Sequence, residues 1–325
     1  MSLTALDLSR ARPYAIAMTE RFRGITVREG LLIEGPAGWG DFCPFAEYDD
    51  QVSTSWLATA IEAATIGWPE PVRDRIPVNA TVPAVGPERA HEIVTASGCR
   101  TVKIKVADHP DSLAEDLARV EAVRDALGST GAIRVDANGL WDVDTAVARI
   151  IALDRAAGGL EYVEQPCPSI EELAAVRRRV DVRIAADESI RRADDPLKVA
   201  VAGAADIAVI KCTPLGGVRR SLEVAQAAGL PCVISSALET SVGLAAQLAL
   251  AGALPELDFA CGLGTLALMT GDVTGASLRP VDGFLPVPRT PPVPDPALLE
   301  RFRITDPARE QWWRDRLART AKNLP

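Results

Sequence analysis

The spacing of apolar residues changes near residue 77. Before that point, Phe22–Glu34 has the pattern of a β-strand, and a Gly- and Pro-containing turn at 35–38 leads to a second apolar run at Trp39–Phe42. The segment Gln51–Ile66 then shows helical spacing of its apolar positions. This pattern predicts a small α+β unit, built from a hairpin or meander and one helix.

From Pro77 onward, short apolar runs alternate with longer amphipathic segments. Eight runs have the character of strands: Val78–Val82, Thr101–Val106, Ile133–Asp136, Leu160–Glu164, Val182–Asp187, Asp206–Lys211, Pro231–Ser235 and Leu257–Ala260. The segments between them predict helices at Ser112–Ala126, Val143–Ala156, Ile170–Arg179, Pro196–Ala202, Gly217–Ala228 and Val242–Ala251. Strand–helix alternation with short connections predicts a parallel sheet, and eight repeats predict a closed (β/α)8 barrel.

The change of pattern near residue 77 and the Pro-rich stretch near the C-terminus divide the chain into three expected parts. Residues 1–76 are expected to form the α+β unit and residues 77–285 the barrel. The last part, 286–325, starts with a Pro-rich stretch at Val287–Pro296 and continues into the amphipathic segment Asp306–Ala318. We expect this C-terminal segment to pack back on the N-terminal unit.

Composition narrows the classes of function. The 325 residues are 48% hydrophobic and 24% charged, with a net charge of −9, so the chain lacks the basic excess that a nucleic-acid partner requires. No run of eighteen apolar residues occurs, and Met1–Arg12 has no hydrophobic signal core, so we expect a cytoplasmic protein without membrane contact. The six cysteines include no C-x-x-C pair and suit buried positions in a reducing compartment. The pattern does not indicate an oligomeric state.

Ionisable residues interrupt the apolar strands near one end. Lys103 and Lys105 lie two positions apart on the second strand, so both side chains point to the same face. The next four strands end at Asp136, Glu164, Asp187 and Lys211, and the steps from Lys105 are 31, 28, 23 and 24 residues, about one βα unit each. In a barrel these ends converge at the C-terminal face, where active sites lie.

Three carboxylates on adjacent strands would repel one another in the absence of a cation. Oxygen ligands prefer a hard divalent ion, and three carboxylates with waters or substrate oxygens suit octahedral Mg²⁺. No His or Cys lies at these positions, which disfavours zinc. The pairing of Lys103 with Lys105 is a physical reason to expect a lowered pKa at one of them. Metal and lysine together favour abstraction of a proton beside a carboxylate.

Other interpretations of the same residues remain. A structural network of salt bridges would also place acids and lysines in register, but most barrels fill this layer with apolar groups. A lysine at the end of strand six is compatible with Schiff-base chemistry, as in aldolases, but that leaves the three carboxylates unexplained. A barrel that binds a metal or a partner without turnover is the non-enzymatic alternative. His91 and His109 are expected to be surface residues.

The short motifs KIK at 103–105, DAN at 136–138, EQP at 164–166 and DES at 187–189, with Lys211, together resemble the enolase superfamily, specifically its muconate-lactonizing-enzyme subgroup. The resemblance covers nearly the whole chain. Within that subgroup, FRGI at 22–25, GWGDFCPFAEYDD at 38–50, SSALETSVG at 235–243 and CGLGT at 261–265 are similar to o-succinylbenzoate synthases of actinobacterial type.

This resemblance implies a fold and a reaction. The fold is a modified (β/α)8 TIM barrel with an N-terminal α+β capping domain. The reaction is the Mg²⁺-dependent dehydration of the small molecule 2-succinyl-6-hydroxy-2,4-cyclohexadiene-1-carboxylate to o-succinylbenzoate in menaquinone biosynthesis, through abstraction of the α-proton and an enediolate intermediate. The implied metal ligands are Asp136, Glu164 and Asp187, with Mn²⁺ as a substitute ion.

The resemblance also implies roles for the lysines. Lys105 is the base that takes the α-proton and then returns it to the departing hydroxyl, Lys103 tunes Lys105, and Lys211 lies across the substrate ring and stabilises the intermediate by charge and cation–π contact. Neighbouring polar groups are Asn138, within reach of metal and substrate, and Glu188, beside the metal ligands.

Further residues are expected to bind the remainder of the substrate. Ser235 and the backbone at Gly262 and Gly264 are expected to receive the succinyl tail, although a plain turn explains the glycines nearly as well. A capping loop at Thr19–Gly24 is expected to close the site, with Arg23 or Arg21 meeting a substrate carboxylate.

Related chemistries stay open. Two lysines that face each other across an enediolate also suit 1,1-proton transfer, as in N-succinylamino acid racemases or other enzymes of the subgroup. A dipeptide epimerase is disfavoured because no Asp-x-Asp pair follows the eighth strand, and chemistry of the mandelate racemase type is disfavoured because it needs a histidine base.

Overall fold

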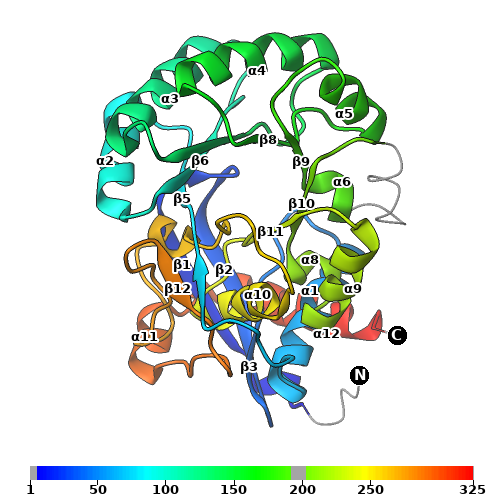
Figure 1. The fold of residues 1–325 in the computed structure, drawn as a ribbon. Helices are drawn as coiled ribbons and strands as arrows, with labels where there is room; N and C mark the ends of the chain where they lie inside the picture. Colours follow the sequence, from blue (N-terminus) through cyan, green and yellow to red (C-terminus); the bar gives the residue numbers. More distant parts are fainter. Residues whose placement is uncertain (1–5, 192–202, 325) are drawn as a thin grey trace.

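The structure is a computed structural model that describes residues 6–191 and 203–324. A curled parallel sheet with helices on its outer side forms the barrel, and an antiparallel sheet packs beside it (Figure 1). This arrangement confirms the predicted fold class. In the described part of the chain, no helix has both the length and the apolar character needed to cross a membrane.

The N-terminal unit is an antiparallel meander followed by a helix. A short 3-10 turn, η2 (Leu8–Arg10), precedes β1 (Arg12–Phe22), β2 (Ile25–Gly35), β3 (Gly38–Phe42) and α1 (Asp50–Thr65). The side chain of Asp49 caps α1 by accepting the backbone N–H of Val52 at 2.7 Å. The helix matches the predicted one within a residue at each end.

The strand predicted over Phe22–Glu34 is wrong at its start, and β1 was not foreseen. The chain reverses at Arg23 and Gly24, whose φ angles of 52° and 79° make a tight hairpin turn between β1 and β2. The expected capping loop at Thr19–Gly24 is therefore the tip of a β-hairpin. Apolar residues on both sides of the turn concealed it, because the pattern runs on without an obvious break.

Seven parallel strands form the barrel sheet in sequence order: β5 (Ala80–Val82), β6 (Thr101–Lys105), β7 (Ala132–Asp136), β8 (Tyr162–Glu164), β9 (Ile184–Ala186), β10 (Ile207–Ile210) and β11 (Cys232–Ile234). The eighth predicted strand, Leu257–Ala260, is wrong by a few residues. Closure comes from isolated parallel bridges of Cys261 to Val78 and of Gly262 to Ser235. The carbonyl of Ala260 instead accepts a hydrogen bond from Arg134 at 2.7 Å, so it does not join a ladder.

Helices cover the outer surface of this sheet (Figure 1). They are α2 (Pro87–Ser97), α3 (Leu113–Leu127), α4 (Val143–Ala157), α5 (Ile170–Arg177), α6 (Glu188–Arg191), α8 (Cys212–Leu215), α9 (Val218–Ala228) and α10 (Ser241–Ala253), with the 3-10 turn η3 (Thr265–Leu268) after the last bridge. Four of the predicted helices correspond to α3, α4, α9 and α10 within two residues, and α5 is two residues shorter than expected. The helix predicted at Pro196–Ala202 lies outside the described residues.

Below its C-terminal end, the interior of the barrel holds an apolar cluster and one buried arginine. A buried cluster separate from the main core fills it with Tyr162, Ala185, Ile207, Val209, Val233 and Phe259. Arg134 crosses this interior and donates to Glu161 at 2.5 Å and to Asn79 at 3.2 Å, while its guanidinium lies 4.7 Å from the centre of the Tyr162 ring. Because the apolar cluster and Arg134 fill the interior below, the charged strand ends form one layer at the mouth.

The C-terminal segment returns to the N-terminal unit. β12 (Phe284–Pro286) pairs with β4 (Arg75–Pro77), and α11 (Pro296–Arg301) and α12 (Pro307–Lys322) follow. On α12, Trp313 packs edge-on against Phe42 at 6.3 Å, and the buried Arg316 donates to the carbonyl of Phe45 at 2.9 Å. The pair β4–β12 lies where we propose the two domain boundaries, after residues 76 and 285.

A buried carboxylate joins the two units. Asp41 on β3 accepts hydrogen bonds from the Tyr14 hydroxyl at 2.9 Å and, in the barrel unit, from the N–H and hydroxyl of Thr240 at 3.1 and 2.7 Å. Burial raises the pKa of Asp41 from its ordinary value of 3.8 to about 6, although the hydrogen bonds of Thr240 and the charge of Arg28 oppose this rise. The folded protein therefore binds this proton more tightly than the unfolded chain does.

We predict that Asp41 makes stability fall as the pH rises. The stabilising contribution is intact below about pH 3.8 and declines as the pH rises towards about 6; about 3 kcal/mol of stability has been lost once the carboxyl is ionised in both states. Urea unfolding of the wild type and of Asp41→Asn between pH 4.5 and 7 measures this loss of stability. The stability difference between the two proteins should change over this range, because Asn does not titrate; a constant difference would contradict the assignment.

Candidate active site

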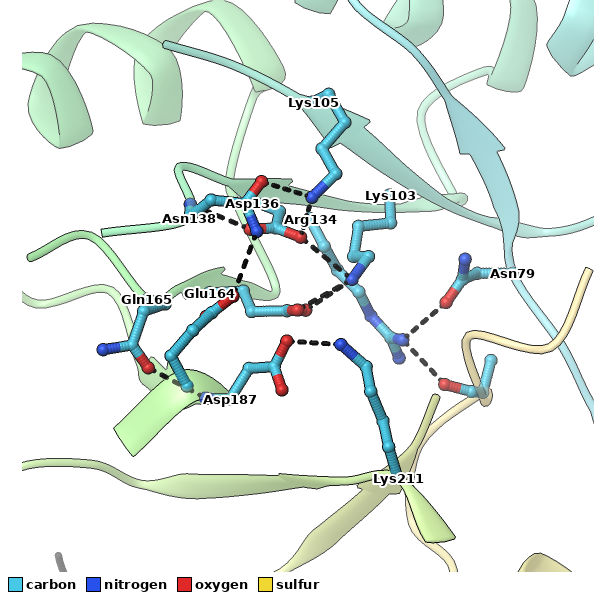
Figure 2. Close-up of polar contacts among 12 residues, drawn as sticks. Asn79, Lys103, Lys105, Arg134, Asp136, Asn138, Glu164, Gln165, Asp187 and Lys211 are labelled. Carbon is cyan, nitrogen blue, oxygen red and sulfur yellow. Dashed lines mark hydrogen bonds and ion pairs between the residues drawn. The ribbon is translucent and has the colours of Figure 1, made fainter. Parts of the chain in front are cut away.

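The charged residues of five neighbouring strands meet at the C-terminal end of the barrel. In the sheet register, Lys105 lies opposite Asp136 and Asp136 lies opposite Glu164. Asp187 follows β9 directly and Lys211 follows β10 directly. Figure 2 shows the carboxylates in the centre, with Lys105 and Lys211 reaching them from opposite sides. The side chains that the sequence placed at strand ends therefore lie together in one site.

Lys103 is the cation at the floor of this site. Its ammonium group donates to both carboxylate oxygens of Glu164, at 2.8 and 2.7 Å, and to Asp136 at 3.2 Å, and only 8% of its side chain is exposed. Burial alone would lower the pKa of Lys103, but the charges of Glu164 and Asp136 outweigh it and raise that pKa well above its ordinary value. Lys103 is therefore held charged, as a fixed positive group between two carboxylates.

Lys105 lies above Lys103 in a different environment. Its Nζ donates to Asp136 and to the Asn138 side-chain oxygen, both at 2.5 Å, and lies 5.5 Å from the centre of the Phe22 ring. Burial lowers the pKa of Lys105, and the charge of Lys103 adds to this, while Asp136 opposes it; the net result is a lowered pKa. The structure thus distinguishes the two lysines: Lys103 is held as a cation, and Lys105 loses its proton more readily.

The pKa values of the carboxylates Asp136 and Glu164 also differ. The pKa of Asp136 is lowered: burial would raise it, but Lys105 and Lys103 outweigh that effect. Burial and the neighbouring charge of Asp136 raise the pKa of Glu164 to about 7, despite the contact with Lys103. On the far side, Lys211 pairs with Asp187 through an ammonium–carboxylate hydrogen bond. Repulsion among the carboxylates, expected from the sequence, is thus a feature of the site.

The residues after several strand ends adopt left-handed backbone conformations. Ala107, Asn138 and Gln165 have φ angles of 63°, 49° and 40°, which cost free energy for residues other than glycine and occur most often at functional sites. Asn138 turns its side chain back so that its oxygen accepts from Lys105 at 2.5 Å and its nitrogen donates to Glu188 at 3.5 Å. At Asn138 and Gln165, these conformations direct polar side chains into the site.

Gln165 holds the site together and was missed in the sequence. Its side-chain oxygen accepts the backbone N–H groups of Asp187 and Ser189, at 3.0 and 3.1 Å, and its nitrogen donates to the Ser189 hydroxyl at 2.7 Å and to the Cys167 carbonyl at 2.9 Å. Gln165 thereby fixes the turn that presents Asp187. The signal was present in the EQP motif, where a polar residue directly follows Glu164 within a buried segment.

Two cavities open over the charged residues. The inner one, of about 40 Å³, is lined by Lys105, Lys211, Ser235 and Gly262 among others. The outer one, of about 520 Å³, is lined by Arg21, Arg23 and Gln165 among others. They share Phe22, Arg23, Lys105, Asn138 and Glu188, so the outer cavity leads to the inner one. Arg23, at the hairpin tip, stacks 4.3 Å over the Phe45 ring and donates to the Tyr48 hydroxyl at 3.1 Å.

One expected tail-binding residue lies elsewhere. Gly264 does not line the inner cavity, and a side chain there would meet the carbonyl of Asn79 at 2.7 Å, so this glycine permits close packing of the backbone. Thr265 lines the inner cavity in its place. Gly262 does line it, and a side chain there would lie 2.7 Å from the hydroxyl oxygen of Ser235.

The donor set suits a hard divalent cation. Asp136, Glu164 and Asp187 offer carboxylate oxygens from adjacent strands, the ligands that Mg²⁺ prefers. Within residues 6–191 and 203–324, no three His, Cys, Asp or Glu side chains are already arranged as a metal-binding cluster. Lys103 bridges Asp136 and Glu164, and Lys211 binds Asp187. The strand pairing holds the backbones of these three residues next to one another.

Comparison with known proteins identifies relatives over nearly the whole chain. Residues 14–64 match the family of enolase N-terminal domain-like sequences, and residues 87–291 match the enolase C-terminal domain-like family. An o-succinylbenzoate synthase of Thermobifida fusca is 63% identical over 86% of this chain and 87% of its own length. A protein of the same name from Mycolicibacterium smegmatis is 55% identical over 96% of both chains.

Solved structures share the fold at lower identity. The L-Ala-D/L-Glu epimerase from Bacillus subtilis has a TM-score of 0.75 and 23% identity, covering 88% of this chain and 97% of that one. Muconate lactonizing enzyme from Pseudomonas putida has a TM-score of 0.73 and 21% identity, covering 92% of this chain and 99% of that one. At such identities the likeness concerns the fold alone.

We predict that Gln165 contributes measurably to the stability of the site. Gln165→Met removes the partners of two buried N–H groups and one carbonyl, and should lower the free energy of unfolding by roughly 2–4 kcal/mol. Urea denaturation measures this difference. The matched control is Gln226→Met on α9, where the side chain is exposed and the substitution should change little. Equal effects of the two substitutions would contradict the role given to Gln165.

Proposed function

Because the chain belongs to the o-succinylbenzoate synthases of the enolase superfamily, we propose that it dehydrates 2-succinyl-6-hydroxy-2,4-cyclohexadiene-1-carboxylate to o-succinylbenzoate in menaquinone biosynthesis. The observation that carries the proposal is the placement of Lys105 and Lys211 on opposite sides of three buried carboxylates. The six cysteines are all free thiols, which agrees with a cytoplasmic location.

Lys105 is the proposed base. It lies between the cavity and Asp136, its pKa is lowered, and the aromatic ring of Phe22 borders it at 5.5 Å. In the forward reaction, Lys105 removes the proton from the carbon next to the substrate carboxylate. The C–O bond to the hydroxyl then breaks, and the protonated Lys105 returns its proton to the leaving oxygen. One molecule of water is released and the ring becomes aromatic, so atoms and charge balance.

Lys211 and Lys103 have electrostatic roles in this proposal. Lys211 faces the opposite side of the substrate and stabilises the negative charge that develops when the proton leaves. Lys103 remains a buried cation and keeps the ammonium form of Lys105 disfavoured. Asn138 orients Lys105, and Glu188 in turn lies beside Asn138.

Enzymes of the enolase superfamily are generally Mg²⁺-dependent. We propose that Asp136, Glu164 and Asp187 hold Mg²⁺, or Mn²⁺ in its place. Such an ion would supply electrostatic stabilisation of the substrate carboxylate as it gains charge. The distal succinyl group is assigned to the wall formed by Ser235, Gly262 and Thr265, and a substrate carboxylate at the mouth to Arg23.

A second activity follows from the same geometry. Lysines on two sides of one carbon permit removal of a proton from one face and its return on the other, which is racemisation. N-succinylamino acids are the substrates that fit this reaction, since they keep a succinyl group beside an acidic α-carbon. Exchange of the α-proton in D₂O, followed by NMR, tests for it.

The synthase proposal predicts turnover that a chelator abolishes. With Mg²⁺ present, purified protein should remove the absorbance of the cyclohexadiene substrate as the aromatic product forms. Excess EDTA should stop the reaction, and added Mg²⁺ should restore it. Absence of turnover with Mg²⁺ present would overturn the synthase proposal, and turnover insensitive to EDTA would overturn the metal assignment.

The proposal also predicts that Lys105 is indispensable. Lys105→Met removes the group that transfers the proton in the proposed dehydration and should lower kcat by about 10²–10⁴-fold. Lys322→Met, at an exposed position of α12, is the matched control and should keep full activity. A Lys105→Met protein that folds, binds substrate and turns it over at the wild-type rate would contradict the assignment of the base.

A further inference from the structure

The segment that follows β11 forms one wall of the inner cavity. Ser235, Ser236, Ala237 and Leu238 all line it, together with Lys105 and Lys211. This segment begins the SSALETSVG motif, of which the proposed chemistry uses only Ser235. The capping unit contributes two more walls, the aromatic rings of Phe45 and Trp56.

The wall depends on an unfavourable backbone conformation. Leu238 has a φ angle of 66°, in the left-handed region that a leucine rarely adopts, and its side chain is buried at 2% exposure. Such a conformation persists only when its surroundings hold it in place. The contacts of the two peptide groups that flank Leu238 therefore decide the shape of the wall.

A single side chain binds both of these peptide groups. Arg28, from β2 of the capping unit, donates from Nε to the carbonyl of Leu238 at 2.9 Å and from Nη2 to the carbonyl of Ala237 at 3.2 Å. The Ala237 carbonyl lies directly before the backbone of Leu238, and the Leu238 carbonyl lies directly after its α-carbon. Nη2 also donates to the carbonyl of Cys43, which ties the guanidinium to its own domain. Arg28 is itself 2% exposed.

Carboxylates fix the N–H groups of the same turn. Glu239, fully buried, accepts the N–H of Ala237 at 2.7 Å and is held by the Thr213 hydroxyl and the Gln247 amide, each at 2.8 Å. Asp41, from the capping unit, accepts the N–H of Thr240 at 3.1 Å. The turn is thus held from the barrel side by Glu239 and from the capping side by Arg28 and Asp41.

Arg28 also supports the opposite wall. Its guanidinium lies 4.5 Å from the centre of the Phe45 ring and 5.9 Å from that of Trp56, and Arg23 of the hairpin tip stacks on the same Phe45 at 4.3 Å. Arg28 does not line the inner or the outer cavity, so it does not touch a substrate there. Its contacts reach two walls of the cavity at once.

We propose that Arg28 is a positioning residue for substrate binding: it holds the Ala237–Leu238 turn in its left-handed conformation and so sets the shape of the pocket wall. The proposal rests on the synthase function proposed above. The wall lies beside Ser235 and receives the part of the substrate remote from the reacting carbon. Loosening it should weaken binding of substrate and transition state alike, which raises KM and leaves kcat nearly unchanged.

The test compares Arg28→Lys with a matched control, Arg73→Lys. Arg73 also donates to backbone carbonyls, those of Ala251, Gly252, Leu254 and Pro255 at 2.6, 3.5, 2.6 and 3.0 Å, but it lines neither the inner nor the outer cavity. Arg28→Lys should raise KM for the cyclohexadiene substrate by at least about tenfold, with kcat within about threefold of wild type. Arg73→Lys should leave KM unchanged, whatever its effect on Tm. A lowered Tm with an unchanged KM in Arg28→Lys would overturn the proposal.

A second substitution tests the strained residue directly. Leu238→Gly removes the cost of the positive φ angle, so the turn should need less support from Arg28. In the Leu238→Gly background, Arg28→Lys should therefore raise KM much less than it does in the wild type. Equal increases in both backgrounds would contradict the role of the turn. If Arg28→Lys does not fold, Glu239→Gln loosens the same turn from the barrel side, and an unchanged KM there overturns the proposal.

If the proposed synthase function is wrong, the wild type itself will not turn over the substrate, so this outcome is distinct from a wrong role for Arg28. In that case, hydrogen–deuterium exchange of residues 235–240 measures whether Arg28 holds the Ala237–Leu238 turn. Arg28→Lys should speed exchange of the Ala237 and Leu238 amides relative to Arg73→Lys. Exchange at the same rate in both variants would show that Arg28 does not hold the turn.

Discussion

Mutual neutralisation of carboxylates and lysines at the C-terminal end of the barrel is the interaction on which this site depends. Three acids and three lysines, none with more than 14% of its side chain exposed, face one another there, and each would be costly to bury alone. The parallel register places Lys105, Asp136 and Glu164 side by side on adjacent strands, so each charge finds its partner. The apolar cluster around Tyr162 closes the interior below and confines this layer to the mouth.

The same layer is built to be reactive as well as stable. Lys103 contacts two carboxylates and is held as a cation, whereas Lys105, two residues later, has a lowered pKa because burial and Lys103 outweigh Asp136. Left-handed backbone conformations follow the strand ends at Ala107, Asn138 and Gln165, and at the last two they turn polar side chains inward. Backbone strain at these positions is tolerated because hydrogen bonds, above all those of Gln165, hold the turns.

The capping unit takes part in the site in two distinct ways. Its hairpin tip brings Phe22 and Arg23 to the mouth of the cavities. Its buried residues Arg28 and Asp41 act further inside, where they bind backbone groups of the barrel segment after β11. Two motifs nearly two hundred residues apart in the sequence, around Asp41 and around Thr240, are thus parts of one hydrogen-bonded interface.

The sequence by itself determined the fold class and the charged strand ends, because the period of apolar residues reports secondary structure and each βα unit returns the chain to the same end of a barrel. It did not reveal the hairpin turn at Arg23–Gly24, the closure of the barrel at Cys261 and Gly262, or the part played by Gln165. Nor did it show that Gly264 packs on Asn79 instead of lining the cavity. These features depend on contacts between segments distant in the chain, and on backbone angles that apolar spacing does not encode. Only the tertiary structure therefore decided which polar residues face the cavity and which, like Arg28, shape it from behind.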